Sequence, residues 1–137
     1  MKIYPTGKCF DDALDYLMAH VSKKPLWLVH GIVHFPESQV NLLPEFQHLA
    51  GKRFAHAWVE DETLVWNHGI LENGVPIVYA VEKEEYYTEM QVEKVTKYTP
   101  SETLVLNEKF MTYGPWEQAY MDLCRNPVKL NLPGGVD

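Results

Sequence analysis

Residues 9–21 constrain the fold most strongly, because their apolar side chains recur at the spacing of a helix. The recurrence at i, i+3, i+4 and i+7 gives one apolar stripe, made of Phe10, Ala13, Leu14, Leu17, Met18 and Val21. Thr6 is the predicted N-cap, and 22–25, which end in a proline, are predicted to stop the helix. Such a stripe needs a partner surface, so a sheet or further helices must pack on it.

Apolar and β-branched runs after this helix predict an antiparallel sheet. The predicted strands are 26–34, 54–60, 63–68, 75–82 and 92–98, with a short helical turn at 83–90 and C-terminal helices at 99–113 and 116–124. The long stretch 35–53 reads as a functional lid. We therefore predict an α+β fold in one domain, 1–137, whose N-terminal helix packs on four to five antiparallel strands.

Charge and cysteine content narrow the classes of function. The chain of 137 residues has a net charge of −7 and no basic cluster, which argues against nucleic acid or an anionic membrane as partner. There is no apolar run of about 20 residues and no signal-peptide core at the N-terminus. The two cysteines, Cys9 and Cys124, do not form a disulfide scaffold, so we expect reduced thiols and a cytoplasmic location.

Cys9 falls where the first helix is predicted to begin. Unpaired N–H groups and the helix dipole favour an anion there, which is how a thiolate is stabilised for nucleophilic attack. Lys8 adds a positive charge, whereas Asp11 and Asp12 oppose the thiolate. The alternative is that Cys9 is a small buried apolar residue under the helix. Cys124 is interpreted as a core residue.

A histidine in an apolar strand supplies a possible base for Cys9. A two-residue turn at 61–62 pairs His56 with Asn67 on one face, so the amide can orient the imidazole. A one-residue bulge would pair His68 with His56 instead, which leaves His68 as the alternative orienting residue. Trp58 shares the face of His56, and Glu60 is interpreted as a solvated strand end.

The segments Gly7-Lys8-Cys9-Phe10, Val29-His30-Gly31 and His56-Ala57-Trp58-Val59-Glu60 resemble the papain-like fold superfamily, in particular small domains related to NlpC/P60 and transglutaminase-like proteins. The resemblance implies a nucleophilic cysteine at a helix start, a histidine base on one strand and a polar residue on the next. Carried onto this chain, these are Cys9, His56 and Asn67. It also implies an oxyanion donor near the cysteine, for which Tyr4 is the candidate beside the Cys9 backbone N–H.

These patterns lead to one hypothesis with an alternative. The hypothesis is a thiol-dependent hydrolase or acyl transferase that acts on a peptide or a small amide substrate, with Tyr4, His30, Trp58 and His68 as binding residues. The alternative is an inactive binding module with the same fold. His30 and His34 could join His56 or His68 around a metal, but no acidic or cysteine ligand completes the set, so no metal or cofactor is predicted. The oligomeric state is left open.

Overall fold

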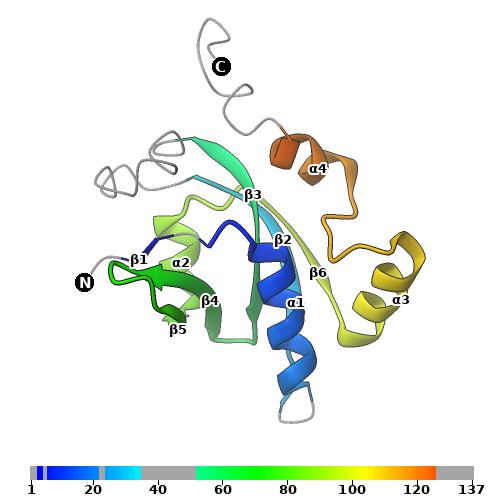
Figure 1. The fold of residues 1–137 in the computed structure, drawn as a ribbon, viewed down its shortest axis with the longest axis horizontal. Helices are drawn as coiled ribbons and strands as arrows, with labels where there is room; N and C mark the ends of the chain where they lie inside the picture. The colour runs from blue at the N-terminus through cyan, green and yellow to red at the C-terminus, as the bar shows by residue number, and fades with distance from the viewer. Residues whose placement is uncertain (1–2, 5, 22–23, 35–51, 126–137) are drawn as a thin grey trace, which may run out of the picture.

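The computed structural model describes residues 3–4, 6–21, 24–34 and 52–125 (Figure 1). In chain order the elements are β1 (Ile3–Tyr4), α1 (Cys9–His20), β2 (Trp27–His34), β3 (Arg53–Glu60), β4 (Leu64–Leu71), β5 (Pro76–Glu82), α2 (Lys83–Glu89), β6 (Lys94–Tyr98), α3 (Pro100–Phe110) and α4 (Gln118–Arg125). The predicted α+β class, with an N-terminal helix on an antiparallel sheet and helices at the C-terminal end, is confirmed. The sequence did not predict β1, and most of the expected lid at 35–53 lies outside the described residues.

The strands form one antiparallel sheet in the order β1-β4-β3-β2-β6, with β5 on the other edge of β4. One edge of β4 is shared by two partners in succession. Val65 and Trp66 pair with the end of β3, and Ile70 and Leu71 then pair with β1. Strand β3 therefore leaves β4 between these two ladders, and the segment that it leaves contains Asn67.

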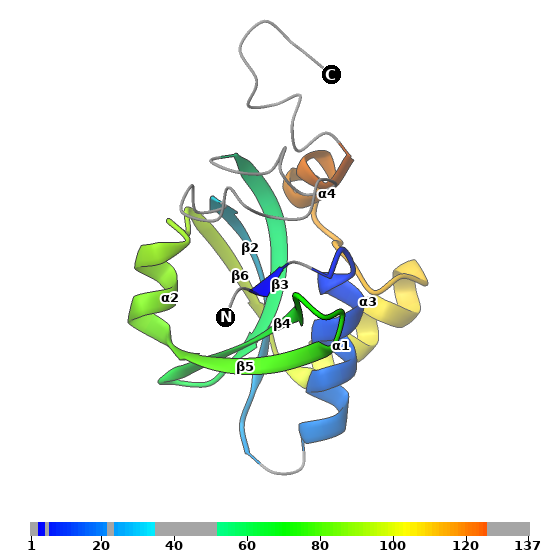
Figure 2. The same ribbon diagram turned by 60° about the vertical axis from the view of Figure 1, so that its left-hand side comes forward.

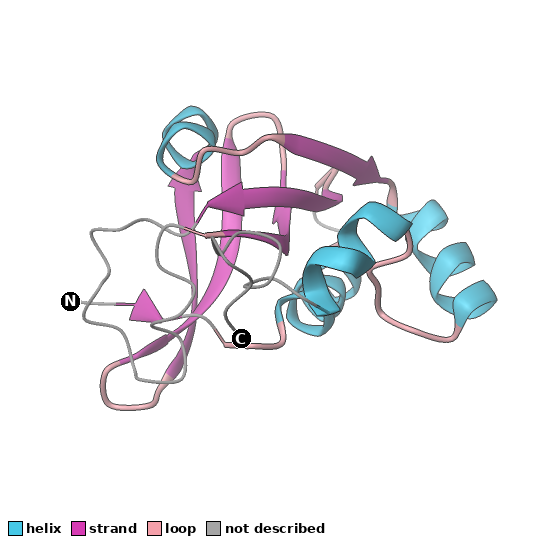
Figure 3. Ribbon diagram, turned by 90° about the horizontal axis from the view of Figure 1, so that it is seen from above, coloured by secondary structure: helices cyan, strands magenta, loops and turns pink. Residues whose placement is uncertain are grey.

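Two apolar clusters hold the helices to opposite faces of this sheet. Helices α1, α3 and α4 lie on one side and α2 lies on the other, as Figures 2 and 3 show. Under α1 and the C-terminal helices the buried cluster includes Leu14, Leu17, Leu28, Ala57, Val59 and Tyr120. Under α2 it consists of Val29, Val33, Trp58, Val65 and Tyr86. Alternate residues of β3 thus face different helices, as strand geometry requires.

Gly31, in the central strand β2, allows Trp58 to pack closely against the backbone. A Cβ atom at position 31 would lie 2.6 Å from Cη2 of Trp58 and 3.0 Å from the carbonyl oxygen of Lys94. The indole therefore occupies the space that any larger residue would need.

The turn between β3 and β4 comes one residue later than predicted. The Asp61 N–H donates to the Leu64 carbonyl, and the Asp61 carboxylate accepts from the N–H groups of Thr63 and Leu64. An aspartate at the first position of a turn stabilises it in this way. As a result Glu60 pairs with Val65 and not with Thr63. The predicted register was wrong by two residues, but a shift of two keeps every side chain on its predicted face.

Local hydrogen bonds set the ends of the helices. The predicted N-cap of α1 was wrong, because Lys8 holds that position without a side-chain bond. Thr6 instead donates to the Asp12 carboxylate and accepts from the Lys8 N–H. Helix α3 starts at the predicted place with a capping box, in which Thr99 and Glu102 each bond the other's backbone N–H.

Candidate active site

His56 and Asn67 form a buried hydrogen bond across the point where β3 leaves β4. The Nε2 atom of His56 lies 2.9 Å from Oδ1 of Asn67. The two residues are 7% and 5% exposed, so little water competes for the bond. Since an amide oxygen only accepts, Nε2 carries the proton and Nδ1 carries the lone pair. The predicted contact between the His56 and Asn67 side chains is present, although the two residues are not paired in the sheet.

Two tyrosines complete the hydrogen bonds of the Asn67 amide, and the sequence analysis did not identify them as site residues. The Nδ2 atom of Asn67 lies 3.0 Å from the Tyr79 hydroxyl, on β5, and 3.3 Å from the Tyr86 hydroxyl, on α2. Tyr86 is buried, at 4% exposed. The alternation of Ile77, Tyr79 and Val81 along β5 was the only sequence signal for Tyr79.

Cys9 is the first residue of α1 and is partly buried against the cluster beneath that helix. Four residues separate it from β1, which pairs with Ile70 and Leu71 at the end of β4. Burial raises the pKa of the Tyr86 hydroxyl well above its usual value, and the charge of Cys9 raises it further. Cys9 therefore lies within electrostatic range of a tyrosine that is bonded to Asn67.

Burial controls the protonation of His56. It lowers the pKa of the imidazole to about 4, although the hydrogen bond to Asn67 raises it and the charge of His68 lowers it. At neutral pH the ring is therefore uncharged. Its Nδ1 atom is buried and has no hydrogen-bond partner within the described part of the chain. The ring thus holds a buried lone pair, but its pKa of about 4 lies below the value near neutral pH at which a general base is most effective.

His68 is not the residue that orients His56. Its ring packs edge-on against Tyr16 of α1, with the ring centroids 5.8 Å apart, so it faces α1. Burial lowers its pKa, and the charges of Asp12 and Asp15 on α1 oppose that shift. The alternative register that would have paired His68 with His56 is therefore wrong.

The prediction that His30 lines a substrate groove is also wrong. Its side chain is fully buried, enclosed by aromatic rings whose centroids lie 4.8–6.1 Å away: Phe10, Tyr98, Trp116 and Tyr120. A Cβ atom on Gly114 would lie 2.8 Å from its Cε1 atom. Burial lowers the pKa of His30 to about 3, and neither ring nitrogen has a hydrogen-bond partner among the residues that the structure describes.

Trp58 and Glu60 belong to a buried polar network, which contradicts both predictions for them. Trp58 is fully buried, so it does not line a substrate site, and its Nε1–H donates to Glu60 at 2.9 Å. Glu60 is not solvated: its carboxylate is fully buried and contacts Lys83 at 2.7 Å and Lys97 at 2.8 Å. The Tyr87 hydroxyl donates to it at 2.7 Å. Burial alone would raise the pKa of Glu60, but these hydrogen bonds together lower it.

Tyr4 lies in β1 opposite Ile70. The structure does not describe the Tyr4 side chain, so its predicted role as an oxyanion donor lies outside the described residues. The same holds for the prediction that Cys124 is a core residue.

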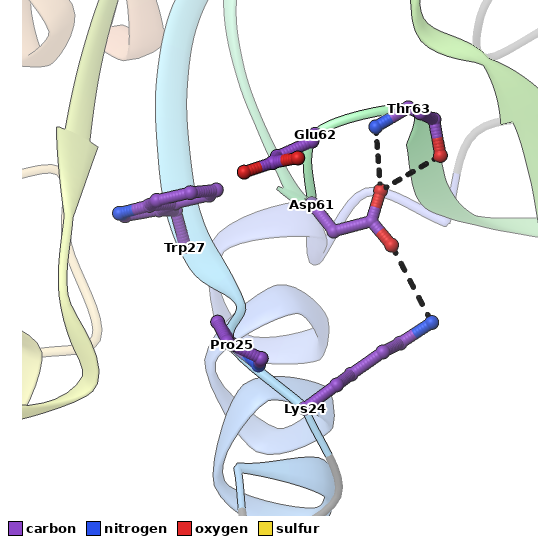
Figure 4. Close-up of a pocket in the computed structure, with 6 residues that line it drawn as sticks. All are labelled: Lys24, Pro25, Trp27, Asp61, Glu62 and Thr63. Carbon is purple, nitrogen blue, oxygen red and sulfur yellow. Dashed lines mark hydrogen bonds and ion pairs between the residues drawn. The ribbon is translucent and has the colours of Figure 1, made fainter.

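Two surface pockets lie around the turn between β3 and β4, away from His56. One has a volume of about 360 Å³ and is lined by Lys24, Pro25, Trp27, Asp61, Glu62 and Thr63 (Figure 4). The Asp61 carboxylate in it already accepts two turn N–H groups and lies 3.5 Å from the Lys24 ammonium. The other, of about 710 Å³, lies beside Lys83, whose ammonium is paired with Glu60. The charged groups of Asp61 and Lys83 therefore serve the fold, and neither pocket contains a catalytic set.

No three histidine, cysteine or acidic side chains in the described ranges lie close enough together to bind a metal ion. None of the helices described has the length and apolar character needed to cross a bilayer. Comparisons with protein-family models, curated proteins and solved structures give no match for this chain. The geometry of the site is therefore the basis on which a function is proposed.

Proposed function

We propose that this chain is a thiol-dependent hydrolase or acyl transferase that acts on an amide or peptide bond. Cys9 is the nucleophile, His56 is the general base and acid, and Asn67 orients the imidazole. The observation that supports this most is the buried bond from His56 Nε2 to Asn67 Oδ1, because it leaves Nδ1 as the basic atom. The position of Cys9 as the first residue of α1, where unpaired backbone N–H groups favour an anion, supports it further.

In the proposed reaction His56 Nδ1 takes the thiol proton while the sulfur attacks the carbonyl carbon. The C–N bond then breaks, the proton passes from Nδ1 to the leaving amine, and a thioester remains on Cys9. Water resolves the thioester in a hydrolase, and an amine resolves it in a transferase. The Cys9 N–H, with the Tyr4 hydroxyl as a sequence-based candidate, would bind the oxyanion. The imidazole is neutral at pH 7, so in this path it accepts the proton during attack and no ion pair is formed beforehand.

The test is acylation of Cys9 by p-nitrophenyl acetate, followed by mass spectrometry of the intact protein. A Cys124→Ser background leaves one thiol. At pH 7 we expect His56→Gln to slow acylation by about 10²-fold, the lower range for loss of a general base. His20→Gln is the matched control, because that ring is in the last turn of α1 and bonds the Tyr16 backbone, and it should react at the parental rate. Equal rates in the parent and His56→Gln would contradict the proposal.

A binding module without turnover is the second candidate, and two observations favour it. A buried imidazole with a pKa of about 4 does not stabilise a thiolate as an imidazolium would. Asp11 and Asp12 in the first turn of α1 also disfavour the thiolate. Iodoacetamide labelling of Cys9 across pH separates the two candidates. A module predicts slow labelling with the profile of a free thiol, whose pKa is about 8.5, and no change in His56→Gln.

A further inference from the structure

The side-chain amide of Asn67 has two orientations that differ in the chemistry they impose on His56. In the structure Oδ1 faces His56 Nε2, and Nδ2 faces the hydroxyls of Tyr79 and Tyr86. Turning the amide by 180° would place Nδ2 against the imidazole. The imidazole would then need its lone pair on Nε2 and its proton on Nδ1.

Only one of these orientations supports a base on the Nδ1 side. A proton on Nε2 leaves the Nδ1 lone pair available, whereas a proton on Nδ1 prevents that atom from accepting another. The orientation of one amide therefore decides which nitrogen of His56 is basic. Since Asn67 is buried, neither orientation can be held by bulk water, and the neighbouring hydroxyls must hold it.

The two tyrosines have the properties that this role needs. Both are neutral at pH 7, because burial raises the pKa of Tyr79 and of Tyr86. A hydroxyl that donates its proton elsewhere keeps its lone pairs for an N–H donor. The Tyr86 hydroxyl oxygen accepts from Asn67 Nδ2 at 3.3 Å and is buried, so no bulk water replaces that bond. The Tyr79 hydroxyl, on β5, accepts the second N–H of the Asn67 amide.

We propose that Tyr79 and Tyr86 are positioning residues, which accept both N–H bonds of Asn67 and thereby keep the proton of His56 on Nε2. This inference rests on the proposed function, in which Nδ1 takes the proton of Cys9. Loss of both hydroxyls removes the preference of the amide for one orientation. If the two orientations become equally populated, half of the molecules lose the base, and acylation of Cys9 falls by at least about twofold.

The experiment is long-range ¹H–¹⁵N NMR of the histidine rings in protein labelled on histidine nitrogen, recorded at pH 7. His56→Gln identifies the signals. In the parent we expect a protonated Nε2 and an unprotonated Nδ1. In Tyr79→Phe/Tyr86→Phe we expect the two ¹⁵N shifts to move toward each other as the tautomers mix. Tyr87→Phe is the matched control: it removes a hydroxyl bonded to Glu60 from the same helix and should leave the His56 tautomer unchanged.

An Asn67→Asp background keeps the test informative if mixing has another cause. A carboxylate accepts at both oxygens, so turning it by 180° does not change which nitrogen of His56 is protonated. In that background, above the pKa of His56, the two Tyr→Phe changes should leave the proton on Nε2. A parent with its proton on Nδ1, or a double variant that keeps Nε2 fully protonated, overturns the proposal. Because this readout needs no turnover, a Cys9 that fails to acylate would contradict the proposed function and leave the positioning result standing.

Discussion

His56 Nε2 lies 2.9 Å from Asn67 Oδ1, beyond the residues at which the two strands that carry them are paired. The ladder between β3 and β4 is described at Val59–Trp66 and Glu60–Val65 only. A side-chain bond thus links the strands where they separate. This bond fixes the imidazole and also contributes to the junction, so its loss should affect both activity and stability.

Asn67→Ala tests this link. The change removes the acceptor for His56 Nε2–H and leaves a buried donor unsatisfied, which costs about 1–3 kcal/mol. We expect the free energy of unfolding, measured with urea, to fall by that amount. Asn107→Ala, which removes a hydrogen bond to Thr112 on the surface, is the control and should cost less. Equal losses in the two variants would show that the buried bond contributes nothing special.

Glu60→Gln should be strongly destabilising. The change removes the buried charge that pairs with Lys83 and Lys97, whose side chains are 23% and 37% exposed. Breaking a buried ion pair costs about 3–5 kcal/mol, and we expect the lower end because both ammonium groups keep some water. Urea unfolding at pH 7 measures this, with the exposed Glu62→Gln as control. The same contacts lower the pKa of Glu60, so their contribution is present at neutral pH and is lost as the pH falls through the folded-state pKa.

His30→Leu should make stability less sensitive to acid. The pKa of His30 is about 3 in the folded protein and about 6.5 when unfolded, so between these values only the unfolded chain binds the proton. Stability therefore falls as the pH drops from about 6.5 toward 3, by about 1.4 kcal/mol per unit of pKa difference. In His30→Leu we expect a shallower dependence, since one histidine with a lowered pKa is removed and His56 and His68 remain. Unfolding in urea at pH 7, 6 and 5 measures the slope, and an unchanged slope would contradict the enclosure of His30.

Gly31→Ala should destabilise through Trp58. The new methyl group would lie 2.6 Å from the indole, and overpacking of this kind costs about 1–3 kcal/mol. In a Trp58→Phe background the second ring is gone, so the same change should cost less. A double-mutant cycle of unfolding free energies measures the coupling between the two positions. If the losses of unfolding free energy in the two single variants simply added up in the double variant, the new methyl group at position 31 would not be clashing with Trp58.

The parts of the fold that are local in sequence were predictable. The stripe under α1, the strand alternation of β3 and β4 and the capping signal at Thr99 depend on neighbouring residues, and all three appear in the structure. The His56–Asn67 pair was also predicted, although the turn was placed one residue early. The predicted contact is still present because the resulting register shift of two residues keeps each side chain on the same face of the sheet.

What could not be predicted depends on packing between distant segments. Glu60 was predicted to be a solvated strand end, because nothing nearby in the sequence shows that Lys83 of α2 and Lys97 of β6 contact it. His30 looked like a groove residue, because the connection that covers it at Gly114 lies 84 positions later in the chain. Tyr86 joins the site through the fold of α2 and not through any motif near Cys9.

Strands β1 and β3 compete for the same edge of β4, and the boundary between them falls in the segment that contains Asn67. If the pairing of β3 with β4 extended to Asn67, that residue would be part of the regular ladder. If the pairing of β1 with β4 extended from Ile70 toward Asn67, β1 would separate β3 from β4 there and increase the distance between the amide and the imidazole. The distance between His56 and Asn67 thus depends on where these two short ladders end. Small changes in strand pairing at this boundary would alter or abolish the proposed activity.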